Sequence, residues 1–136
     1  MKLNELNEFT RAYIIAALWT FDDESPSGDY ESSGRPEKLF DKLASETAET
    51  MIREADAFQG IYGFLWRESG SFAPSPRPAL LTDAQAGHDF WLTRNHHGAG
   101  FWDRGIGEAG DTLTKRAQEY GGRDLYFGDD GLIYIG

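Results

Sequence analysis

The sequence predicts an α+β fold in which a helical N-terminal half packs on a small antiparallel sheet of two hairpins. Apolar residues recur at helical spacing through the first 65 residues. In the second half, aromatic and β-branched runs flank turn residues, which is typical of hairpins. The chain has 136 residues, 40% of them hydrophobic, a length that supplies one core rather than two. We therefore expect a single domain over residues 1–136.

The N-terminal half is expected to hold two helices joined by an acidic loop. A first helix over 4–20 is indicated by Leu6, Phe9 and Tyr13, which fall on one face. The segment 21–34 is rich in Asp, Ser and Gly without any period, so it predicts a loop. A second helix should begin at Pro36, because small and apolar residues then step by four along one face: Leu39, Leu43, Thr47, Met51 and Ala55.

The C-terminal half begins with a proline-rich connector over 69–79, which favours an extended chain. Thr82 and Gln85 have capping-box spacing, so a short helix should start at Asp83. The aromatic run 90–94, the turn 95–98 and the run 99–103 predict a first hairpin. A helix over 108–120 and a second hairpin turning at Asp130-Gly131 should follow. The expected buried residues are Leu43, Met51, Ile52, Phe90 or Trp91, and Ile133.

Charge is distributed unevenly along the chain. The sequence has 23 acidic and 13 basic side chains, a formal net charge of -10. Residues 1–59 carry -7, residues 60–106 carry 0 and residues 107–136 carry -3. One stretch of the predicted loop has carboxylates without any basic residue between them: Asp22, Asp23, Glu24, Asp29 and Glu31. This stretch is either a solvated loop or a surface that attracts a basic partner.

The composition excludes several classes of protein. The absence of cysteine excludes a disulfide framework, a zinc-thiolate site and a thiol nucleophile, and it fits a reducing cytoplasm. No apolar run approaches the ~20 residues of a membrane span, and the polar, acidic first residues predict no secretory signal. Direct binding to nucleic acid is disfavoured, since a protein of charge -10 repels phosphates.

The segment 88–104 is the densest in side chains that can carry chemistry. A metal site would use His88, His96 or His97 with a nearby aspartate, but the predicted hairpin separates its tip from its base by about 16 Å. We therefore expect neither a metal nor another cofactor. An acid-base site would pair a histidine with Asp89 or Asp103, yet no nucleophile motif accompanies them, so no catalytic residue is assigned.

Two further interpretations of this segment remain open. Its aromatic and basic side chains are able to stack on single-stranded bases or clamp a protein partner. Alternatively, the aromatic residues fill the core and the charged residues form structural ion pairs. The candidate binding residues of the segment are Trp91, Arg94, His96, His97, Trp102, Asp103 and Arg104.

The motif HDFWLTRNHHGAGFWDRG over 88–105 resembles one found in small acidic proteins encoded by tailed bacteriophages and prophages. The similarity extends to FTRAYIIAALW near the start and DLYFGDDGLIY near the end, and so covers most of the chain. The resemblance implies a phage accessory protein that acts in the cytoplasm of the infected bacterium. It supplies no activity and no functional residues.

These observations favour a non-enzymatic protein whose acidic surface engages a host or phage protein, including one that itself binds nucleic acid. The alternatives are a small hydrolase or nucleic-acid-processing enzyme, or a single-strand binder, each using the segment 88–104. A homo-oligomer is also open, because an apolar edge strand near the C-terminus is able to pair between copies.

Overall fold

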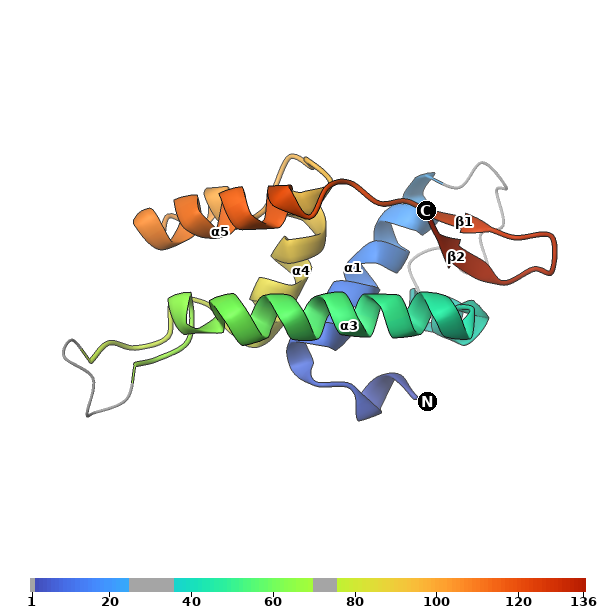
Figure 1. Cartoon of the computed structure of the whole chain (residues 1–136), viewed down its shortest axis with the longest axis horizontal. Coiled ribbons are helices and arrows are strands. Elements are labelled where there is room, and N and C mark those ends of the chain that lie inside the picture. The colour runs from blue at the N-terminus through green and yellow to red at the C-terminus, as the bar shows by residue number, and fades with distance from the viewer. Residues whose placement is uncertain (1, 25–35, 70–75) are drawn as a thin grey trace.

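The computed structural model describes residues 2–24, 36–69 and 76–136, and it has the predicted α+β fold (Figure 1). Helices occupy most of the chain and a single antiparallel hairpin follows them within these residues. In chain order the elements are η1 (Leu3–Glu5), α1 (Glu8–Glu24), α2 (Pro36–Leu39), η2 (Phe40–Lys42), α3 (Ser45–Tyr62), η3 (Gly63–Leu65), α4 (Asp83–Arg94), η4 (Phe101–Asp103), α5 (Glu108–Glu119), β1 (Leu125–Phe127) and β2 (Ile133–Ile135).

Stacked aromatic rings form the centre of the core. The ring of Phe58 on α3 lies 4.1 Å from that of Phe90 on α4, and Tyr13 on α1 stacks on Phe90 at 4.8 Å. Phe9 on α1 stacks on Trp66, which follows η3, at 5.4 Å. Each of these side chains is fully buried. Because the rings come from α1, α3, α4 and the turn after η3, the cluster fixes α1, α3 and α4 against one another.

The first helix is confirmed with shifted ends. α1 begins at Glu8, after Asn7, whose side-chain Oδ1 accepts a hydrogen bond from the Thr10 backbone N–H at 2.9 Å. It continues to Glu24, so the start of the predicted loop 21–34 is helical. The rest of that loop, from residue 25 on, lies outside the described residues, as do residues 70–75 of the proline-rich connector.

The second helix was predicted as one piece from Pro36, and this prediction is wrong. The chain forms α2 and η2, becomes extended at Leu43 and Ala44, and only then begins α3 at Ser45. The C-terminal hairpin explains the break, since the Ala44 N–H and the Thr47 hydroxyl both donate to the Ile133 carbonyl at 3.0 Å. A tertiary contact therefore overrides the helical preference of the local sequence.

The first predicted hairpin, over 90–103, is also wrong. The capping box of Thr82 and Gln85 starts α4 as expected, but the helix continues through the aromatic run to Arg94. Phe90 and Trp91 are both buried, because α4 packs against α1 on one side and against α5 and η4 on another. The return segment forms η4 instead of a strand, so the sheet has one hairpin rather than two.

The last helix and the C-terminal hairpin are confirmed. α5 ends just before Gly121, which has φ +77, and β1 pairs with β2 in antiparallel register with Leu125 opposite Ile135. Of the predicted core residues, Met51, Phe90, Trp91 and Ile133 are buried. Leu43 and Ile52 are half-buried and pack against the core.

Candidate functional site

Arg94, predicted as a binding residue, lies inside the protein with only 1% of its side chain exposed. Its Nη1 lies 3.0 Å from Glu54 Oε2 and donates to the Tyr13 hydroxyl at 2.8 Å. Its other nitrogens donate to the backbone carbonyls of Tyr120 and Gly121. All the donors of this guanidinium therefore point inward, and Arg94 joins α4 to α1, α3 and the end of α5.

The surroundings of Arg94 keep it charged. Burial acts to lower the pKa of Arg94, but the Tyr13 oxygen and the Glu54 carboxylate outweigh it, so the pKa is raised. Burial also raises the pKa of the Tyr13 phenol well above its ordinary value. The group is a permanent ion pair with a neutral tyrosine, which suits a structural role rather than proton transfer.

A second ion pair uses Asp89 and Arg104. Asp89 is 2% exposed and accepts two hydrogen bonds from the Arg104 guanidinium, at 2.7 and 3.0 Å. His88 Nδ1 lies 3.3 Å from Asp89 Oδ1. Hydrogen bonding to Asp89 raises the pKa of Arg104. This pair ties α4 to the turn after η4. The interpretation in which charged residues of the segment form structural ion pairs had Arg104 pair with Asp103, whereas its partner is Asp89.

The other candidate residues of the segment do not form one surface. Trp91 is buried and its indole N–H donates to Thr20 Oγ1 at 2.9 Å, whereas Trp102 is 53% exposed. His96 and Asp103 are exposed. His97 is half-buried and borders a cavity of about 20 Å³, which has room for roughly one water. Among the described residues, no three His, Asp or Glu side chains gather closely enough to hold a metal ion.

The acidic stretch is only partly described. Asp22, Asp23 and Glu24 form the last turn of α1, while Asp29 and Glu31 lie outside the described residues. In Figure 1 this end of α1 lies at the same end of the molecule as the C-terminal hairpin. The Phe21 ring, just before the stretch, contacts Phe127 of β1 with centroids 5.2 Å apart. The acidic turn therefore lies beside the hairpin.

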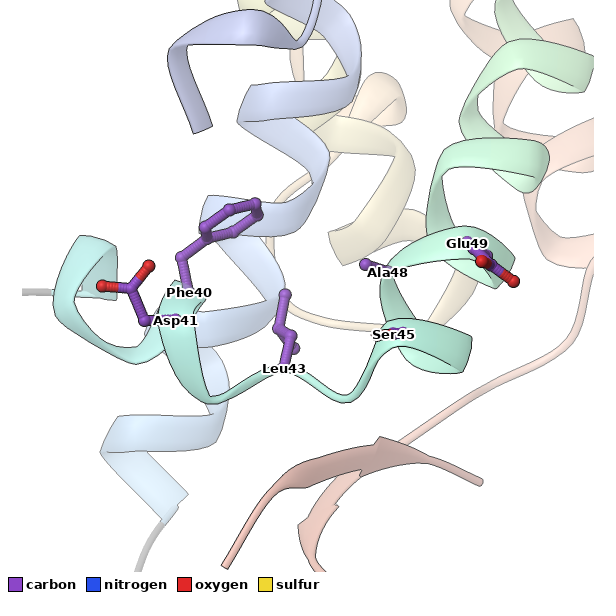
Figure 2. Close-up of a pocket in the computed structure, with 6 residues that line it drawn as sticks. All are labelled: Phe40, Asp41, Leu43, Ser45, Ala48 and Glu49. Carbon is purple, nitrogen blue, oxygen red and sulfur yellow. The ribbon is translucent and has the colours of Figure 1, made fainter. Parts of the chain in front are cut away.

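A pocket of about 320 Å³ lies where η2 meets the first turns of α3 (Figure 2). Asp41 projects from η2 on one side, Glu49 lies on α3 on the other, and Leu43 stands on the extended segment between them. Both carboxylates are exposed. The six lining residues are Phe40, Asp41, Leu43, Ser45, Ala48 and Glu49, and none of them is basic. The pocket therefore combines three apolar side chains with a serine and two negative charges.

This lining matches a cationic side chain with an aliphatic stem. A lysine or arginine places methylene groups against apolar surface while its charged end stays at the polar rim. Asp41 and Glu49, whose carboxylates lie on opposite sides and point away from each other in Figure 2, would attract that charge at the rim, and Phe40, Leu43 and Ala48 would contact the stem. The sequence did not reveal this site, because one continuous helix over 36–55 leaves no hollow between Asp41 and Glu49. The break at Leu43 and Ala44 creates it.

Comparison with protein families, curated proteins and solved structures found no match to this chain. The resemblance of the motif to phage proteins therefore stays a prediction. No described helix is long and apolar enough to cross a membrane.

Proposed function

We propose that this protein is a non-enzymatic accessory protein of a phage or prophage, which acts in the host bacterial cytoplasm by binding a basic protein through its acidic surface. The partner is a host or phage protein, and nucleic-acid-binding proteins are the class richest in suitable basic surfaces. One observation carries the proposal: the pocket that places Asp41 and Glu49 around an apolar lining without a basic residue.

The charge distribution supports this function. The pocket belongs to residues 1–59, which carry -7 of the net charge of -10. A field of this sign accelerates the encounter with a basic partner before any contact forms, and salt weakens the effect. The long-range attraction and the pocket thus both favour a positively charged side chain of the partner.

The segment 88–104 gives less support to the two alternative functions, a single-strand binder and a hydrolase or nucleic-acid-processing enzyme. Trp91 and Arg94 are buried, so they are not placed to stack on single-stranded bases. Asp89 and Arg104 bond to each other, and His96 and His97 lie beyond the end of α4 rather than beside that pair. A single-strand binder would have Trp102 as its exposed aromatic residue in this segment, and a hydrolase would have His88, whose carboxylate partner Asp89 is already bonded to Arg104.

The pocket is tested with a lysine-rich peptide whose binding is followed by fluorescence anisotropy. The double variant Asp41→Asn/Glu49→Gln should bind about 5- to 30-fold more weakly, since two exposed ion pairs contribute roughly 1–2 kcal/mol together. The matched control is Glu108→Gln/Asp111→Asn, which removes the same charge from exposed positions on α5. Equal weakening in both variants would show a nonspecific charge effect and contradict the pocket.

The cellular partner is tested by affinity capture from infected bacteria, read by mass spectrometry. A basic protein should be enriched by the wild-type chain and by the α5 control, and lost with the pocket variant. Neutralising the acidic stretch (Asp22, Asp23, Glu24, Asp29 and Glu31) should slow capture most at low salt, where charge attraction is least screened. Equal recovery with every variant would refute binding through the acidic surface.

A further inference from the structure

A further pocket, of about 210 Å³, lies between α3 and the C-terminal hairpin. Glu46 and Thr50 line it from α3, Tyr126 and Tyr134 line it from the two strands, and Arg123 lines it from just before β1. Since an α-helix turns by about 100° per residue, its α3 residues fall on the opposite side of the helix from those of the first pocket. We call this hollow the hairpin pocket.

One end of the hairpin pocket carries positive charge that carboxylates do not balance. Arg123 Nη1 lies 3.6 Å from Glu54 Oε2, but this oxygen is closer to Arg94, at 3.0 Å. Two guanidinium groups therefore share one carboxylate, which leaves one positive charge in excess. Arg53 is exposed and donates to the Thr50 hydroxyl at 3.3 Å, and it has no ion-pair partner among the described residues. Two arginines thus adjoin one pocket of a strongly acidic protein.

The other end of the hairpin pocket is negative. The Tyr134 hydroxyl donates to Asp130 Oδ2 at 2.6 Å, and this bond is the main cause of the raised pKa of Tyr134, to which the Glu46 charge contributes. Glu46 precedes Arg53 by seven residues, about 10 Å along the helix axis. The rings of Tyr126 and Tyr134 stack with centroids 6.0 Å apart. The pocket therefore has an aromatic wall and ends of opposite charge.

We propose that the hairpin pocket binds a small aromatic acid, with its single carboxylate at the arginine end. Guanidinium groups donate paired hydrogen bonds to a carboxylate, and tyrosine rings pack against a flat ring. Arg123 uses its Nε for the Gly136 carbonyl at 3.1 Å, which leaves its terminal nitrogens without a hydrogen bond among the described residues. The volume is below the ~300–1,000 Å³ of pockets for larger ligands, so the acid is small. Glu46 repels a second negative charge at the far end.

The test is a titration of the full chain with benzoate, followed by the amide signals in nuclear magnetic resonance spectra. The Thr50 and Ile135 amides, which belong to the pocket, should shift and saturate at millimolar benzoate. Benzyl alcohol has a similar ring without the charge and should bind more weakly. Terephthalate, with a second carboxylate at the opposite end of the ring, should also bind more weakly than benzoate, although it carries more charge. Glu46→Gln should reduce this preference for benzoate.

Variants test the arginine end of the pocket. Arg123→Gln should weaken benzoate binding at least about 10-fold, because charge-assisted hydrogen bonds are lost. Arg53→Gln should weaken it as well, and it leaves the contacts of Glu54 in place, so it tests the site even if Arg123→Gln disturbs the fold. The matched control is Arg116→Gln, which removes the same charge from α5 and should bind benzoate as the wild type does. The dispersion of the amide signals reports whether each variant is folded.

Three results would overturn the inference. The first is that benzoate shifts no amide of the hairpin pocket, or shifts them no more than benzyl alcohol does. The second is that terephthalate binds more tightly than benzoate, since total charge would then decide. The third is that Arg116→Gln weakens binding as much as Arg123→Gln. The inference does not rest on the proposed function, because the lysine-rich peptide is expected at Asp41 and Glu49, on the other side of α3.

Discussion

Arg94 Nη1 on α4 lies 3.0 Å from Glu54 Oε2 on α3, and the same nitrogen reaches the Tyr13 hydroxyl on α1 at 2.8 Å. One buried cation thus connects the three helices that surround the aromatic core. Arg123, just before β1, lies 3.6 Å from the same Glu54 oxygen. The carboxylate of Glu54 is therefore shared by two arginines, one inside the core and one at its edge.

Replacing Arg94 should strongly destabilise the fold. Arg94→Met keeps an apolar stem but leaves two backbone carbonyls without their donor and Glu54 without the nearer of its two arginines. Removing one partner of a buried ion pair costs about 3–5 kcal/mol. Urea unfolding followed by tryptophan fluorescence measures the loss. Arg116→Met, which breaks an exposed pair with Glu119, is the matched control and should cost less than about 1 kcal/mol. Equal losses would mean that Arg94 does not hold the helices together.

Gly87 should not tolerate a side chain. A Cβ at this position would clash with the backbone carbonyl of Phe9, because α4 packs closely against α1 there. Gly87→Ala should therefore cost about 1–3 kcal/mol or more through overpacking. Gly60→Ala on α3, where a Cβ would meet nothing within 4 Å, should instead stabilise the helix by up to about 1 kcal/mol. Thermal unfolding at low protein concentration compares the two, and a neutral Gly87→Ala would disprove the close approach.

Tyr134 should ionise at unusually high pH. Its hydroxyl donates to Asp130 Oδ2 at 2.6 Å, and this bond raises the pKa of Tyr134 to about 12 and lowers that of Asp130. Since the folded tyrosine has the raised pKa, the bond stabilises the hairpin below the ordinary tyrosine pKa of about 10, and this stabilisation is lost as pH rises through 12.

Ultraviolet titration of tyrosine ionisation measures this effect. Asp130→Asn should return one tyrosine towards its ordinary pKa, while Asp129→Asn, at the neighbouring turn position, should leave the titration unchanged. For Asp130, whose folded pKa is lowered, the same bond should weaken at the acid end, as pH falls below the ordinary aspartate value. Identical titration curves for the wild type and Asp130→Asn would contradict the hydrogen bond.

Purified protein should contain no stoichiometric transition metal, as the sequence predicts. Elemental analysis measures this directly after preparation without chelators. A content of about one zinc or iron per chain, lost in His88→Ala or His97→Ala, would contradict the prediction. Such a metal content would also support the hydrolase alternative, because a bound metal supplies an activated water.

Elements with a local cause were predictable from the sequence. The Thr82-Gln85 capping box depends on residues three positions apart and occurs as expected. The C-terminal hairpin also forms, although its turn centres on Asp129 and Asp130, with the Gly131 N–H bonded to the Gly128 carbonyl, rather than on the Asp130-Gly131 pair. The run 90–94 was predicted as a strand but belongs to α4. Adjacent buried aromatic residues are compatible with either a covered strand or a helix packed on more than one side. The packing of α4 between its neighbouring helices determines which of the two forms, and this packing cannot be read from the local sequence.

The candidate site was not predictable, for a related reason. The pocket exists because Ala44 bonds to Ile133, a residue 89 positions further along the chain. No local pattern records that contact, and the small residues over 44–48 favour a continuous helix. Two of the binding residues expected in the segment 88–104 are buried, for a different reason. Arginine and tryptophan suit an exposed binding surface, yet Arg94 and Trp91 each find internal partners that sequence spacing does not reveal.

The hydrogen bonds from Ala44 and Thr47 to the Ile133 carbonyl also make the pocket depend on the C-terminal hairpin. On the ribosome, residues 36–62 are made well before Ile133, and without its carbonyl they are free to extend as one helix. The hollow between Asp41 and Glu49 then opens only when the newly made C-terminal hairpin docks and interrupts that helix. The pocket and the docked hairpin should therefore form together, and a chain whose hairpin is displaced should lack the hollow.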